Sequence, residues 1–161
     1  MLLALVSCGN KTEQSAGVTI PQLQEQLRKD SIALDELQKR YQIPLQTDFH
    51  WCDSMLQYLP KESIDPCFDV LNLAQAYLRQ FNEMLPIMRQ DLAYTQQQLL
   101  RLQNDLDTRY INKSLATEYL HDETAVADTL HQRILYFQDR LALQEHELQS
   151  LKADMNNLVT P

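Results

Sequence analysis

The sequence predicts an all-α protein, an elongated antiparallel coiled-coil hairpin with one or two shorter N-terminal helices packed at its base. Of its 161 residues, 28 are Leu and 19 are Gln, and both residue types are favourable in helices. The only two glycines are Gly9 and Gly17, whereas β turns and phosphate-binding loops depend on glycine. Apolar residues beyond position 18 recur at the three- and four-residue spacing of packed helices.

The first predicted helix extends from residue 20 to residue 43. Its apolar residues form one stripe, in which Asp30 is the single polar interruption. Pro44 should end this helix, because the residue before a proline disfavours the α conformation. A short second helix is expected to follow Asp48 and to end at Pro60.

Two longer helices should follow, each of about 45 residues, over 66–110 and 114–158. Asp65 suits the N-cap of the first and Pro66 suits its first helical position. Both contain apolar residues repeating every seven positions, which is typical of a coiled-coil seam. These seam positions are Leu71, Leu78, Leu85, Leu92, Leu99 and Leu106, and then Leu120, Ala127, Ile134, Leu141, Leu148 and Met155.

The segment 107–114 separates these helices and is rich in weak helix formers. A turn there would create an antiparallel hairpin with arms of equal length. Its rival is one continuous rod over 66–158 that forms a homodimer, because both segments share one heptad phase. In the hairpin, Tyr110 and Ile111 would lie at the tip as a contact point for a protein partner that the sequence does not identify.

The N-terminal residues Leu5-Val6-Ser7-Cys8 resemble the lipobox of bacterial lipoproteins, and the polar run after Cys8 resembles lipoproteins of Bacteroidetes-type bacteria. The resemblance implies that residues 1–7 are the remainder of a signal, that Cys8 is diacylated on sulfur, and that 8–17 form a polar tether to a helical body over 18–161. Because the apolar stretch is short, we expect the translation start to lie upstream. The implied location is the cell envelope, through acyl chains on Cys8 in the membrane, with the outer membrane favoured over the inner.

The net charge argues against some classes of partner, and the cysteine content indicates a possible disulfide. The net charge of −8 disfavours nucleic acid and anionic lipid surfaces as partners. In an oxidising envelope, Cys52 and Cys67 would remain as a pair that could form a disulfide, the alternative being two buried thiols.

The spacing of potential catalytic and metal-binding residues predicts neither an enzyme nor a cofactor or metal site. Glu118-x-x-His121 and Asp128-x-x-His131 have the spacing of di-iron ligands, but both are expected on a solvated helix face. The predicted function is therefore a lipid-anchored, non-enzymatic cell-envelope scaffold or protein-interaction module. A periplasmic chaperone or stress sensor, and a cytosolic coiled-coil adaptor, remain the alternatives.

Overall fold

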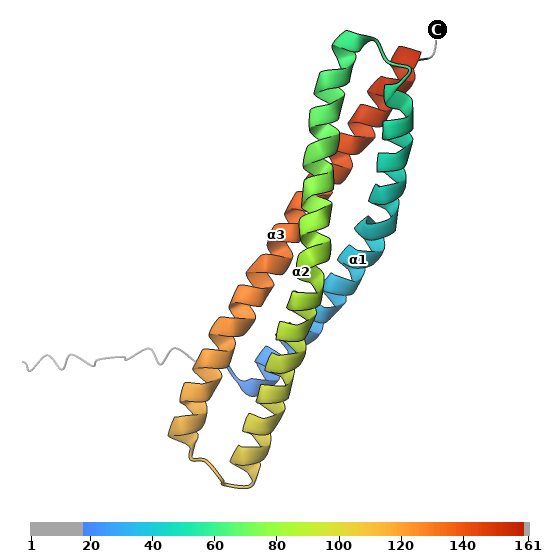
Figure 1. The fold of residues 1–161 in the computed structure, drawn as a ribbon. Helices are drawn as coiled ribbons and strands as arrows, with labels where there is room; N and C mark the ends of the chain where they lie inside the picture. The colour runs from blue at the N-terminus through green and yellow to red at the C-terminus, as the bar shows by residue number, and fades with distance from the viewer. Residues whose placement is uncertain (1–17, 160–161) are drawn as a thin grey trace, which may run out of the picture.

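The computed structural model describes residues 18–159, and this part of the chain contains three helices and no strand. They are α1 (Ile20–Leu56), α2 (Lys61–Asp107) and α3 (Lys113–Val159). The chain reverses direction after α1 and again after α2, so the three helices lie side by side in an elongated bundle (Figure 1). The all-α prediction is confirmed. No helix of the described segment carries an apolar stretch long enough to cross a bilayer.

α1 is a single helix of 37 residues, so the prediction that it ends at Pro44 is wrong. An internal proline removes one backbone hydrogen bond and costs about 3 kcal/mol. The buried stripe nevertheless continues across this point, with Tyr41, Leu45 and Phe49 all buried. Each buried side chain of this size contributes about 1.5–3 kcal/mol. Burial on both sides of Pro44 therefore outweighs the cost of the proline, and one N-terminal helix forms instead of two.

α2 begins five residues earlier than Pro66, the first helical residue predicted from the sequence. Pro60 occupies the N-cap position, and the N–H of Ser63 donates to its carbonyl at 2.9 Å. Pro66 therefore lies inside the helix and does not start it. Pro86 also lies inside α2, which continues past it as the unbroken heptads predict. α2 and α3 have 47 residues each.

The α2–α3 connection, residues 108–112, lies within 107–114, the segment whose weak helix formers predict a turn. Arg109 has φ 58°, in the left-handed region that glycine usually occupies at this position. The N–H of Tyr110 donates to the carbonyl of Asp105 at 2.8 Å, and that of Arg109 to the carbonyl of Leu106 at 3.1 Å. This pair of bonds is a Schellman motif, which satisfies the carbonyls that α2 leaves unpaired at its end.

Most of the predicted seam residues form one core shared by the three helices. Phe81 of α2 and Phe137 of α3 pack edge to face at its centre, with ring centroids 5.4 Å apart. Leu106 and Leu120, the seam positions nearest the turn, are only half-buried. Among the residues whose burial is described, three polar side chains are buried with the apolar ones: Asp30, Thr95 and Gln144. Of these, Asp30 accepts hydrogen bonds from two side chains, Gln26 and His131.

Candidate functional site

The buried carboxyl of Asp30 forms a polar cluster between α1 and α3. Asp30 is 2% exposed, and its Oδ1 accepts from Nδ1 of His131 at 2.7 Å and from Nε2 of Gln26 at 3.1 Å. The Gln26 amide nitrogen also lies 3.0 Å from His131 Nδ1. The second carboxyl oxygen, Oδ2, is buried without a hydrogen-bond partner. The cluster joins α1 to α3 and has one unsatisfied acceptor.

Sequence reasoning placed His131 on a solvated face, whereas the structure turns it toward α1 and leaves it part-buried. The signal that could have found this contact is Asp30 itself. A carboxyl in an otherwise apolar stripe needs a hydrogen-bond donor on a neighbouring helix. The cluster holds one carboxyl and one imidazole, and the described residues contain no group of three or more His, Cys, Asp or Glu side chains that could hold a metal ion.

Ion pairs along α1 set its position relative to the other two helices. Arg40 pairs with Glu145 of α3 at 2.7 Å, and Asp48 accepts from Lys152 of α3 at 2.6 Å. On the other side of α1, Asp35 accepts from Arg89 of α2 at 2.6 Å. These pairs and the Asp30 cluster place charged partners at intervals along the bundle. They favour one register of α1 over a shift by a helical turn.

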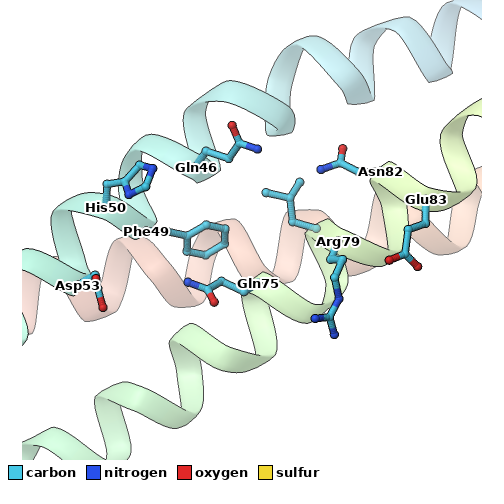
Figure 2. Close-up of a pocket in the computed structure, with 9 residues that line it drawn as sticks. Gln46, Phe49, His50, Asp53, Gln75, Arg79, Asn82 and Glu83 are labelled. Carbon is cyan, nitrogen blue, oxygen red and sulfur yellow. The ribbon is translucent and has the colours of Figure 1, made fainter.

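A hollow of about 700 Å³ lies between α1 and α2 (Figure 2). Its floor is apolar, and its rim carries polar and charged groups. α1 supplies Gln46, Phe49, His50 and Asp53, and α2 supplies Gln75, Leu78, Arg79, Asn82 and Glu83.

The side chains of this hollow do not converge on one point. The charged end of Arg79 extends away from α1 in Figure 2. Asn82, one of the lining residues, has its Oδ1 buried without a hydrogen-bond partner. The lining contains no Ser, Thr or Cys nucleophile. The arrangement can hold a polar group, but it offers no pairing of nucleophile and base.

Cys52 and Cys67 are both buried free thiols, so the disulfide expected from the sequence is not formed in the structure. They lie on different helices, each packed into the apolar core. Burial raises the pKa of Cys52 to about 11, although the nearby Lys152 acts in the opposite direction. Burial, followed by the charge of Asp154, also raises the pKa of Cys67. Both thiols are therefore poor nucleophiles at neutral pH.

The predicted tip pair is divided by the structure. Tyr110 is 83% exposed, whereas Ile111 packs against the core and is half-buried. The next residue, Asn112, accepts the N–H of Leu115 through Oδ1 at 2.9 Å and so caps α3. Only the tyrosine is thus presented as a contact residue. Cys8, the predicted lipidation site, lies outside the described residues.

Comparison with known proteins adds no further constraint, since no family model, curated protein or solved structure matches the chain.

Proposed function

We propose that the protein is a lipid-anchored, non-enzymatic component of the bacterial cell envelope, and that its helical body is a scaffold or protein-interaction module. The observation that carries the proposal is the lipobox-like Leu5-Val6-Ser7-Cys8, which precedes a polar run and then the helical body. Two acyl chains on one cysteine are sufficient for stable anchoring. The outer membrane is the favoured location.

We further propose that α2 and α3 act together as an antiparallel coiled-coil hairpin. The buried heptad residues of both helices and the Phe81–Phe137 contact support this arrangement. At about 1.5 Å per residue, each 47-residue helix is about 70 Å long. Such a hairpin would hold Tyr110 at a fixed distance from the opposite end of the bundle.

The anchoring proposal is tested by replacing Cys8 with Ala in the full-length protein and separating membranes from soluble material. The parent should be recovered with the membranes and Cys8→Ala in the soluble fraction. Cys52→Ala is the matched control, since it also removes one thiol, and it should stay with the membranes. Unchanged membrane recovery of Cys8→Ala would contradict the proposal.

The interaction role is tested by in-cell crosslinking, followed by capture of the full chain from intact envelopes. Tyr110→Ala should lose at least one partner that the parent captures. Tyr58→Ala is the control, because Tyr58 is also exposed but lies in the α1–α2 connection at the opposite end of the bundle. If the parent, Tyr110→Ala and Tyr58→Ala all capture the same proteins, Tyr110 at the tip is not a contact residue. Capture of none would remove the interaction role.

A further inference from the structure

We propose that the protein forms an antiparallel homodimer through the side of α2 and α3 that α1 does not cover, with the two-fold axis passing beside Leu143. This inference goes beyond the anchoring role and does not depend on lipidation. It rests on three observations: α1 packs against only one side of α3, the outer side of α2 and α3 exposes apolar side chains, and the charges along one stripe of α3 follow a particular order.

α3 has one side that faces α1 and another that lies beside α2 on the outside of the bundle. His131, Glu145 and Lys152 all bond to α1 and mark the first side. Arg133 and Arg140 mark the other side. Arg133 pairs with Asp91 of α2 at 3.3 Å, and the guanidinium of Arg140 lies 5.9 Å from the ring centroid of Tyr77, also on α2.

The outer side of α2 and α3 exposes large apolar side chains from both helices. On α3, Tyr136 and Leu143 lie one heptad apart, and Leu143 is 45% exposed. On α2, Leu73 and Ile87 are likewise exposed and lie two heptads apart. Leu73 and Ile87 each lie four residues before an α2 residue that contacts an arginine of α3, Tyr77 and Asp91 respectively, and so lie on the same side of α2. Arg140 also contacts the Tyr136 ring, at 5.7 Å from its centroid. The apolar surface and the arginines therefore share one face.

The charges on this face are ordered so that the face is complementary to an antiparallel copy of itself. The α3 outer stripe, defined as the exposed residues Arg133, Arg140, Glu147 and Asp154, repeats every seven positions and places two positive charges before two negative ones. An antiparallel copy with its axis between 143 and 144 sets Arg140 against Glu147 and Arg133 against Asp154 on both sides of the axis. A two-fold interface requires this kind of self-complementary surface.

A hollow at the acidic end of the stripe could receive the arginines of the second copy. Glu147 and Asp154 line a volume of about 590 Å³ between α2 and α3, together with the apolar side chains of Val70, Leu151 and Leu158. The long side chain of an arginine can bury its methylene groups on such a surface while its charged end meets a carboxylate. Leu143, beside the axis, would pack against its own copy.

The available surface is large enough for a stable dimer. With the axis between 143 and 144, residues 128–159 of α3 overlap with the same residues of the second copy. This overlap is about 48 Å long, and two adjacent helices are about 20 Å wide. Such a strip is comparable with the roughly 800 Å² per partner that specific interfaces bury.

The test is the mass of the purified full chain by sedimentation equilibrium across a range of concentrations. The parent should dimerise. An acidic variant, Arg133→Glu with Arg140→Glu, and a basic variant, Glu147→Arg with Asp154→Arg, should each dimerise at least about a hundredfold more weakly, because cross-axis attractions become repulsions. Mixing the two variants should restore a dimer that contains one chain of each. Leu143→Asp should also yield monomers.

The control is Lys29→Glu with Lys39→Glu, which reverses two exposed charges on α1 and should leave the dimer unchanged. Circular dichroism should show that every variant keeps the parent's helix content. A parent that stays monomeric at all concentrations overturns the proposal. A dimer that survives both charge variants and Leu143→Asp overturns it as well, since the interface would then lie elsewhere.

Discussion

Replacing His131 with Leu should destabilise the protein, although the change removes a polar group and adds an apolar one. His131 supplies the shorter of the two hydrogen bonds to Asp30, whose side chain is 3% exposed. Without it, the carboxyl keeps only the 3.1 Å bond from Gln26 and remains buried. A hydrogen bond to a charged group contributes about 1.5–3 kcal/mol, so we expect the free energy of unfolding to fall by about 2 kcal/mol.

The double variant, Asp30→Leu with His131→Leu, should recover this loss. It removes the buried carboxyl together with its partner, and exchanging a buried polar pair for apolar residues is often neutral or stabilising by about 1–4 kcal/mol. Leu at position 30 would also complete the apolar stripe of α1. The double variant should therefore be at least as stable as the parent, and clearly more stable than His131→Leu alone.

The assay is urea unfolding followed by circular dichroism at one fixed protein concentration. For a slope of about 2 kcal/mol per molar urea, a change of about 2 kcal/mol moves the midpoint by about 1 M. Glu118→Leu is the matched surface control, because Glu118 is an exposed polar residue of the same helix, and it should leave the midpoint nearly unchanged. If His131→Leu unfolds at the parent's midpoint, or if the double variant is the less stable of the two, then the Asp30–His131 contact does not contribute as argued.

Three further predictions follow from single residues. Pro44→Ala should raise the free energy of unfolding by about 2 kcal/mol, because it restores a helix hydrogen bond and removes a steric clash, and these gains exceed the cost of a more flexible unfolded chain. An unchanged urea midpoint would show that Pro44 does not strain α1. Cys52 should react with iodoacetamide at pH 8 at least about a hundredfold more slowly in the folded protein than in urea, because its pKa is raised to about 11; equal rates would contradict its burial. Burial, then the charge of Asp122, raises the pKa of Glu123 above 4.5, so the folded state binds this proton more tightly than the unfolded chain and stability falls as pH rises through that range. Glu123→Gln should therefore raise the melting temperature at pH 7 more than at pH 4, and a gain that is the same at both pH values would refute this.

The sequence predicts the helices and their buried faces well, because both depend on local periodicity. The heptad leucines of α2 and α3 follow from spacing, and weak helix propensity predicts a turn near residue 110, although the shared heptad phase left one continuous rod as the alternative. Pro44 shows where local rules fail, since its effect depends on apolar surfaces that α2 and α3 supply from distant parts of the sequence. The start of α2 at Lys61, ahead of Pro66, is a second example.

The candidate site is harder to predict, because its contacts join residues about 100 positions apart. Asp30 is visible in the sequence as an interruption of its stripe, but His131 is identified as its partner only when the register of α1 against α3 is known. Tyr110 and Ile111 are adjacent in sequence and differ in exposure because the Schellman turn points them in different directions. Whether Cys52 and Cys67 form a disulfide likewise depends on the packing between α1 and α2, which a count of cysteines does not describe.

The most direct test of the account is the intact mass and N-terminal peptide of the protein, isolated from the membranes of the cell that makes it. The account predicts a mature chain that begins at Cys8 and carries a thioether-linked diacylglycerol on that cysteine. An unmodified Cys8 within a chain that retains the residues before it would contradict the central claim.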